Sequence, residues 1–330
     1  MDRINEGTYN TPNQFGDYTE LINEYINKIF GQSLDLYLKR YASNNPTGTQ
    51  KLDIDKIEES MGYIDDYLYY YYSFNSEKEF LSIFENLVDN LNFVTVFPPE
   101  KRGYYGEYVD SETLLYINPQ LSASSELSSD ERTRLYICHE LGHIQNAKWM
   151  NKLLPELNSL NYSNEDKQLI IDGFSLLDEA TTQDRAENIT YYYSSKIRPP
   201  MEKRSTRLFN NRPFNTNFDY YGEFQEPTIN FAKTLRGIGK LSSDESVMEE
   251  FDKRSLSGDF ADNILYEYRM DGYEEELYYM MGRLGVIKNA SYEAFGYGNH
   301  DYLEISSNAL LEYNQVVNGM RDYRDPIVRR

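Results

Sequence analysis

His139-Glu140-Leu141-Gly142-His143 is the stretch that decides how the surrounding sequence is interpreted. Ser128 and Glu131 form a capping-box pattern ahead of it, so we expect a long helix that ends at Pro155. Side chains four positions apart share one face of a helix, with β-carbons about 6 Å apart. Both histidines can therefore converge on one tetrahedral ion, which predicts a zinc site.

Glu140 follows His139 by one position, which places it about 100° further around the helix axis. Its carboxylate should flank the metal and reach a zinc-bound water, whose pKa zinc lowers towards about 7. The opposite face carries Ile137, Leu141 and Ile144 and can pack into a core. These residues predict a metal-dependent hydrolase with Glu140 as its catalytic base. The alternative interpretation is two ordinary histidines near a glutamate.

The pentad resembles the HExxH zinc metallopeptidases known as zincins, over roughly Phe93 to Ile197. That resemblance implies hydrolysis of a peptide or protein substrate. It also implies an edge strand that pairs with extended substrate, and Thr113 to Ile117 is the expected strand, since strand addition needs an exposed edge. A weaker similarity to metallopeptidases of the ImmA/IrrE type rests on the pentad and the downstream pair Glu179-Ala180.

A catalytic zinc usually has a third protein ligand, and the glycine and third histidine of metzincins do not follow this pentad. In the gluzincin branch the third ligand is a glutamate on a later helix. The chain resembles that branch at Leu176 to Asp184, which makes Glu179 the expected ligand. The alternatives are Asp178, Asp184, Glu187 and His300. The family's aspartate four positions after the glutamate is Gln183 here, and the acids could instead form a solvated helix face.

His300 is the expected donor to a developing oxyanion, although it could equally be a surface residue at a helix start. Tyr191, Tyr192 and Tyr193 are alternative donors, but their surroundings suggest helix packing. Cys138, the only cysteine, is expected to be a small buried residue rather than a ligand. The one basic cluster comprises Arg198, Lys203, Arg204, Arg207 and Arg212, and it could meet an acidic substrate or the chain's own acidic surface.

The expected fold class is α+β: a mainly helical, zincin-like protein with a small, antiparallel-containing sheet over the metal helix. We expect an N-terminal helical region (1–91), a core with the metal site (92–198) and a mostly helical C-terminal region (199–330). Helical patterns cover roughly 18–41, 53–74, 76–91, a short helix from Ser163 interrupted at Gly173, 174–197, 229–235, 274–284 and 302–317. Strand patterns cover 93–97, 104–109 and 113–117, and we expect them to form a small antiparallel sheet.

The formal net charge of −21 over 330 residues disfavours nucleic acid as a partner, because an acidic surface repels a polyanion. No signal peptide and no run of about 18 apolar residues is apparent, so we expect a cytoplasmic protein that does not enter a membrane. The sequence does not predict an oligomeric state. A zinc-containing regulatory or protein-binding module without turnover is the alternative to a peptidase.

Overall fold

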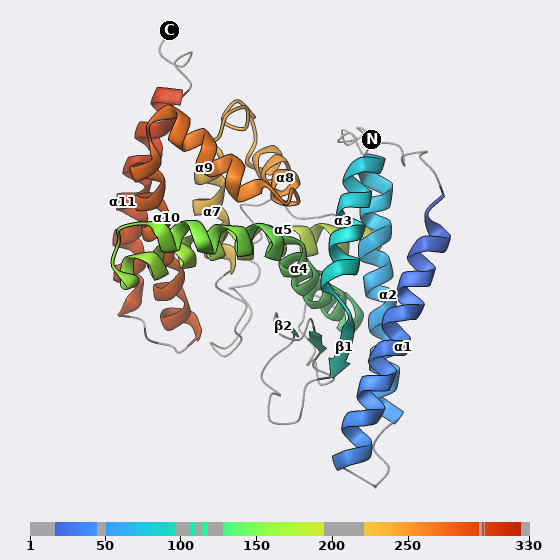
Figure 1. Ribbon diagram of the computed structural model, residues 1–330. Coiled ribbons are helices and arrows are strands. Elements are labelled where there is room, and N and C mark those ends of the chain that lie inside the picture. Colours follow the sequence, from blue (N-terminus) through green and yellow to red (C-terminus); the bar gives the residue numbers. More distant parts are fainter. Residues whose placement is uncertain are drawn as a thin grey trace, which may run out of the picture. The chain divides into compact units, whose positions relative to one another are not determined.

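The computed structural model describes residues 17–44, 51–96, 106–109, 114–117, 128–194, 221–296, 299 and 301–324 (Figure 1). These residues are mostly helical, with very little strand. They divide into two units, the first formed by residues 1–145 and 186–196 and the second by residues 146–185 and 197–330. The division falls inside two long helices, whereas the sequence placed boundaries near residues 91 and 198; those boundaries stay a prediction.

The first unit begins with the three helices that the sequence predicted, α1 (Thr19–Asn44), α2 (Lys51–Phe74) and α3 (Glu77–Asn90). The capping box at the start of α3 is present: the Ser76 amide donates to Glu79 at 2.9 Å, and the Glu79 amide donates back to Ser76 at 3.4 Å. Apolar side chains at helical spacing, such as Ile22, Ile64 and Phe80, are fully buried. Amphipathic periodicity therefore predicted these helices correctly.

Three short strands also belong to the first unit: β1 (Phe93–Val96), β2 (Gly106–Val109) and β3 (Leu114–Ile117). β2 and β3 pair antiparallel as the expected hairpin, but β1 pairs with β3 in parallel, in the order β1-β3-β2. The sheet therefore contains the expected antiparallel pair, and only the expectation that β1 also pairs antiparallel was wrong. Residues 97–113 exceed the dozen or so residues that a parallel crossover needs, so β1 can join β3.

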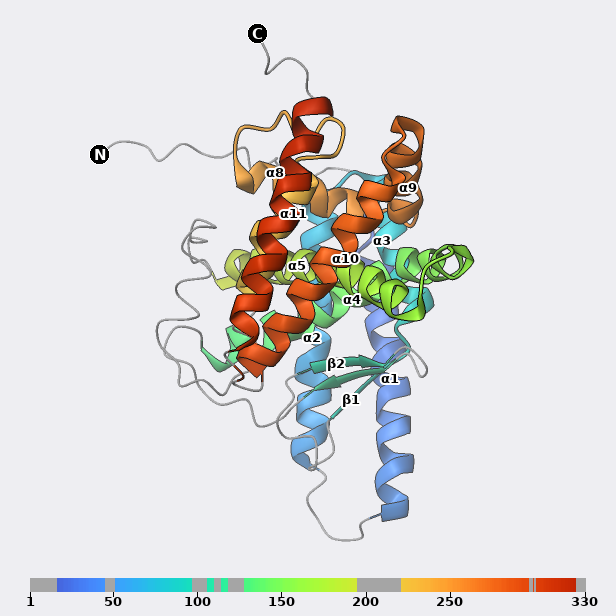
Figure 2. The ribbon, with the colours of Figure 1, turned by 90° about the vertical axis from the view of Figure 1, so that its left-hand side faces the viewer.

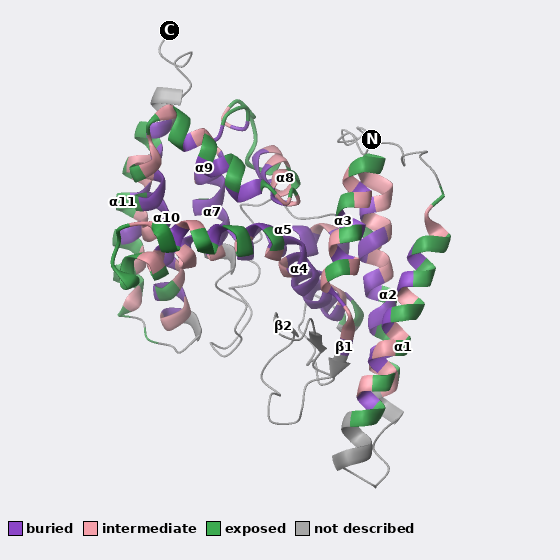
Figure 3. Cartoon of the chain, viewed as in Figure 1, coloured by how far each residue is buried: buried purple, intermediate pink, exposed green. Residues whose placement is uncertain are grey.

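Two long helices, α4 (Ser129–Ser159) and α5 (Asn164–Ser194), follow and are buried over much of their length (Figure 3). α4 does not end at Pro155, as the sequence suggested, but continues through it. Proline removes one backbone hydrogen bond from a helix interior. Leu153 and Leu157, on either side of it, are 1% and 0% exposed, so apolar packing holds the last turn in place.

The expected interruption of α5 at Gly173 was also wrong, and close packing explains why. A β-carbon at Gly173 would lie 2.0 Å from the carbonyl oxygen of Met281, and one at Gly285 would lie 2.0 Å from that of Leu169. Both glycines lie inside helices, in α5 and in α10 (Glu274–Ser291). They let the two backbones approach each other, so glycine marks a contact here and not a helix end.

The rest of the second unit comprises α7 (Tyr221–Ala232), α8 (Asp244–Ser255), α9 (Phe260–Asp271), η2 (Tyr292–Gly296) and α11 (Tyr302–Arg324). α10 and α11 run side by side (Figure 2). The sequence patterns missed α8 and α9. Local signals for both exist: Ser243 accepts from the Ser246 amide at 3.2 Å ahead of α8, and Gly272, with φ of 78°, ends α9.

One apolar cluster lies in the second unit and draws on each helix that the structure describes there. Among its largest fully buried side chains are Trp149 of α4, Phe174 of α5 and Phe251 of α8. Trp149 and Phe260 meet edge to face, with ring centroids 5.1 Å apart. None of the helices that the structure describes is long and apolar enough to cross a membrane.

Candidate metal centre

The first half of α4 carries the pentad, and the local sequence explains why it is helical there. The predicted capping box is present: the Ser128 amide donates to Glu131 at 2.7 Å, and the Glu131 amide donates to the Ser128 hydroxyl at 3.2 Å. Ile137, Leu141 and Ile144 are at most 2% exposed, as expected for the face opposite the histidines. α4 is therefore fixed by its cap at the start and by apolar burial along one side.

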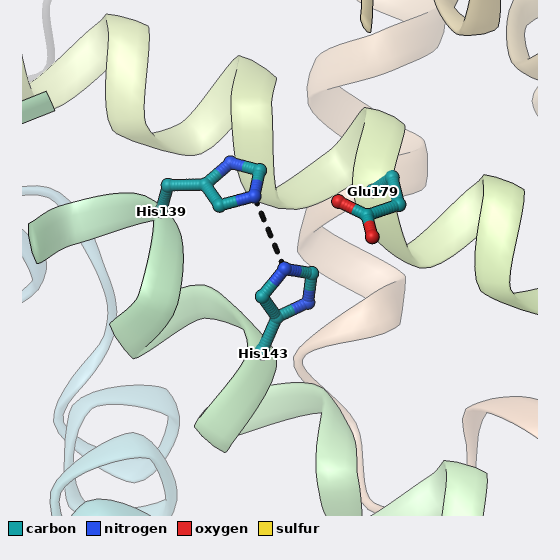
Figure 4. Close-up of side chains that lie close together, drawn as sticks. All are labelled: His139, His143 and Glu179. Carbon is teal, nitrogen blue, oxygen red and sulfur yellow. Dashed lines mark hydrogen bonds between the residues drawn. The ribbon is translucent and has the colours of Figure 1, made fainter. Parts of the chain in front are cut away.

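The two imidazole rings of the pentad face each other, as Figure 4 shows. Nε2 of His139 lies 3.1 Å from Nε2 of His143, and the ring planes are nearly perpendicular, at 87°. Two nitrogens bound to one tetrahedral zinc at about 2.0–2.1 Å are about 3.3 Å apart. The separation of the two nitrogens therefore fits a shared ion. The same distance also allows one ring N–H to donate to the other ring.

Glu179 of α5 joins this pair, with its carboxylate directed towards the two rings (Figure 4). One ligand atom from each of His139, His143 and Glu179 lies within 4.8 Å of the other two. Since ligands of one tetrahedral ion are about 3.3 Å apart, the carboxylate would have to approach by at most about 1.5 Å, which a rotamer change can supply. The donor set of two imidazoles and one carboxylate suits zinc.

The other candidates for a third ligand do not join this group. Among the residues that the structure describes, no second set of three His, Cys, Asp or Glu side chains could hold an ion. Asp178, Asp184 and Glu187 are not part of the set, and His300 lies outside the described residues. The basic cluster from Arg198 to Arg212 also lies outside them. The assignment of the three residues as ligands stays a prediction that the geometry supports.

The four acids from Asp178 to Glu187 do not form a solvated face, so that alternative was wrong. Asp178, Glu179 and Glu187 are between 7% and 9% exposed, and Asp184 is 1% exposed. Removing a carboxylate from water is costly unless hydrogen-bond donors or a cation stabilise its charge. This environment favours a cation near Glu179.

Glu140 is also nearly buried, with 8% of its surface exposed. Its position next to His139 on α4 is the one that the helix geometry predicts for a base flanking the ion. Its role stays a prediction. Cys138 is fully buried, and burial raises the pKa of its thiol well above the ordinary value. Burial thus keeps the thiol uncharged near neutral pH, and the expectation of a small buried residue is confirmed.

The tyrosines at the end of α5 are engaged in packing within the first unit. The hydroxyl of Tyr193 donates to the Asp66 carbonyl at 2.9 Å, and Arg134 lies 5.5 Å from its ring centroid. Tyr192 is 45% exposed and meets Tyr70 edge to face. These contacts match the expectation of helix packing, and they leave the identity of an oxyanion donor open.

The strand expected to pair with substrate is in the wrong place for that role. β3 lies between β1 and β2, so both of its edges are already paired. β1 meets α1 at its outer edge, where the Val94 amide donates to the Ser33 hydroxyl at 2.8 Å. Among the described residues, no strand pairs with the outer edge of β2. The β2–β3 hairpin was predicted correctly, but β1 pairs with the other edge of β3, so β3 is the central strand of the sheet.

The sequence reasoning missed a polar residue of α4 that lies one turn beyond the second histidine. Asn146 is completely buried, and its amide nitrogen donates to Asp178 at 2.6 Å and to the Thr181 hydroxyl at 3.3 Å. A signal was present in the sequence, because Asn146 follows His143 by three positions and so shares its helix face.

No family model matches the chain, and neither a curated protein nor a solved structure matches it.

Proposed function

We propose that this protein is a zinc-dependent metallopeptidase with a zincin-like, α+β arrangement around the pentad. The observation that carries the proposal is the convergence of two imidazole nitrogens 3.1 Å apart with a carboxylate whose oxygen lies within 4.8 Å of them. Their burial supports it, since a cation would compensate the desolvated carboxylate. The proposed substrate is a peptide or protein in the cytoplasm, as the resemblance to zincins implies. The net charge of −21 disfavours nucleic acid as a partner.

His139, His143 and Glu179 would hold the ion, leaving the fourth position of a catalytic site open. When bound, zinc supplies Lewis acidity towards a carbonyl oxygen and acidifies water. Glu140 would then act as general base: its carboxylate takes a proton from water while the water oxygen adds to the peptide carbonyl carbon. The protonated Glu140 returns that proton to the amine nitrogen as the C–N bond breaks. The burial of His139, Glu140 and Glu179 lowers the local dielectric constant, which strengthens each of these electrostatic interactions.

Metal analysis of the purified protein and cleavage of a peptide library test the proposal. We expect one zinc per chain and cleavage that a chelator abolishes. Glu140→Gln should keep its zinc and lose about 10²- to 10⁴-fold in rate, because only the base is removed. Glu156→Gln, on the same helix but about 24 Å further along its axis, is the matched control and should cleave normally.

Three outcomes separate the alternatives. A wild-type protein without stoichiometric zinc would refute the metal site. Normal cleavage by Glu140→Gln would refute the role of Glu140. Stoichiometric zinc with no cleavage of any peptide would instead support a regulatory or protein-binding module.

A further inference from the structure

Asn146 and Asp178 form a buried polar contact between α4 and α5 inside the second unit. Asn146 is 0% exposed and Asp178 is 8% exposed. A carboxylate only accepts hydrogen bonds, so the atom of Asn146 that faces it at 2.6 Å must be the amide nitrogen. Thr181 restrains the same amide group: its hydroxyl accepts from Asn146 at 3.3 Å and donates to the Leu177 carbonyl at 3.0 Å. The orientation of the asparagine is thereby fixed.

Packing alone does not account for an asparagine at this position. The Oδ1 atom of Asn146 has no hydrogen-bond partner among the described residues, although it is buried. A leucine of similar size would avoid that cost, and replacing both members of a buried polar pair by apolar groups is often neutral or stabilising. The best-attested benefit of one buried polar residue between helices is that it fixes their register.

Register matters here because of where the pair lies along the chain. Asn146 is three positions after His143 on α4, and Asp178 immediately precedes Glu179 on α5. Each partner is therefore rigidly connected to one candidate ligand through less than one helical turn. A slide of one helix by a single residue moves a side chain by about 1.5 Å, whereas metal–ligand distances tolerate only about 0.2 Å.

We propose that the Asn146–Asp178 hydrogen bond positions Glu179 for metal binding by fixing the register of α4 and α5. The inference rests on the proposed function, since it concerns the same three ligands. Neither residue touches the ion in this proposal; both act through the helices that carry His143 and Glu179. Positioning residues of this kind change metal affinity typically 10- to 100-fold when they are replaced.

The double variant Asn146→Leu/Asp178→Leu separates positioning from stability. It removes the hydrogen bond and both buried polar groups together, so the metal-free protein should unfold at the same or a higher urea concentration. Zinc affinity, measured by chelator competition, should fall 10- to 100-fold. With Co²⁺ as a spectroscopic substitute, the visible spectrum should change in shape, because the geometry of the ligands changes.

A matched control exists on the same helix. Asn289 donates to Asp172 at 2.8 Å, which ties α10 to α5 six positions before Asp178. Asn289→Leu/Asp172→Leu removes the same chemical pair and should leave zinc affinity and the Co²⁺ spectrum unchanged. The reciprocal exchange Asn146→Asp/Asp178→Asn keeps a carboxylate opposite an amide and should recover most of the affinity.

Several results would overturn the proposal. One is wild-type affinity in the Asn146→Leu/Asp178→Leu protein; another is an equal loss in the Asn289→Leu/Asp172→Leu control. A double variant that does not fold would assign the pair a purely structural role and would overturn it as well. If the wild-type protein itself binds no zinc, the proposed function fails first, and that result is distinct from all of these.

Discussion

The two halves of α5 contribute to the fold in different ways: the first buries one apolar face, and the second is buried at nearly every position before its last turn. The half up to residue 177 contributes Ile170, Phe174 and Leu177 to the apolar cluster, each at most 3% exposed. The stretch from Asp178 to Glu187 contains four acids and one arginine and is buried at every position. Shape decides whether the first half packs, whereas the second half is stable only if each polar group finds a partner.

Replacement of Gly173 should have the largest effect, because it tests the half that depends on shape. An added β-carbon would lie 2.0 Å from the Met281 carbonyl oxygen, a backbone atom that cannot rotate away. We expect Gly173→Ala to lower the free energy of unfolding by at least about 3 kcal/mol, measured by urea denaturation.

Gly282, in α10, provides the control. A β-carbon there would meet nothing within 4 Å, so Gly282→Ala should stabilise the protein by about 0.5–1 kcal/mol through helix propensity. If both substitutions behave alike, close backbone contact is not what requires Gly173.

The sequence predicted the first half of α5 poorly, although its residues are ordinary. Gly173 suggested an interruption and Pro155 a helix end, because both weaken an isolated helix. Contacts between residues distant in sequence override these local preferences. Gly173 packs against Met281, and the turns around Pro155 are held by buried apolar side chains. Such contacts cannot be read from neighbouring residues. The helices of the first unit were predicted well because their amphipathic periodicity is local information.

The polar site was partly predictable for a related reason. Spacing on one helix predicts that His139 and His143 share a face, and the structure places their Nε2 atoms 3.1 Å apart. Glu179 lies on a different helix from the histidines, so spacing alone could not predict it. Only the resemblance to gluzincins suggested it as the third ligand. Asn146 was missed because its spacing from His143 shows only that the two residues share a helix face; its partner Asp178 is identified only after folding.

Arg185 tests whether the polar half depends on partners. Its guanidinium is 1% exposed and lies 2.6 Å from Asp252, and it donates to Ser255 at 3.0 Å. Arg185→Leu should cost about 3 kcal/mol of unfolding free energy, because it leaves a largely buried carboxylate without its cation. The double variant Arg185→Leu/Asp252→Leu should regain most of that loss. A double variant as unstable as the single one would contradict the reasoning.

Glu179→Gln tests function within the same polar half. The amide keeps the shape of the side chain but is a poor zinc ligand, so zinc affinity should fall at least about 100-fold, or about 2.7 kcal/mol. Stability of the metal-free protein should stay the same or rise, since a buried charge is removed. Glu187→Gln is the control, and chelator competition measures both. A larger loss in the control would make Glu187 the ligand instead.

The smallest expected effect concerns Asp65 on α2. This acid is partly buried, and unlike Asp178 its Oδ1 atom accepts no hydrogen bond from a described residue. Burial raises the pKa of its carboxyl above the ordinary value, and the charge of Asp66 raises that pKa further. A raised pKa means that the folded protein holds the proton more tightly than the unfolded chain. The Asp65 charge therefore lowers stability as the pH rises from the unfolded pKa of about 3.9 through the folded pKa.

Asp65→Asn should consequently raise the free energy of unfolding at pH 7, by less than about 1 kcal/mol because solvent screens a half-buried group. The gain should shrink as the pH falls through the folded pKa, and it should vanish below the unfolded pKa of about 3.9, where Asp65 is largely protonated in both states. Asp35→Asn, at an exposed position of α1, is the control and should leave the free energy of unfolding at pH 7 nearly unchanged. Urea denaturation at pH 7 and pH 4.5 measures both variants. A loss of stability at pH 7 would show that the Asp65 carboxylate stabilises the fold, and that buried acids outside α5 are compensated too.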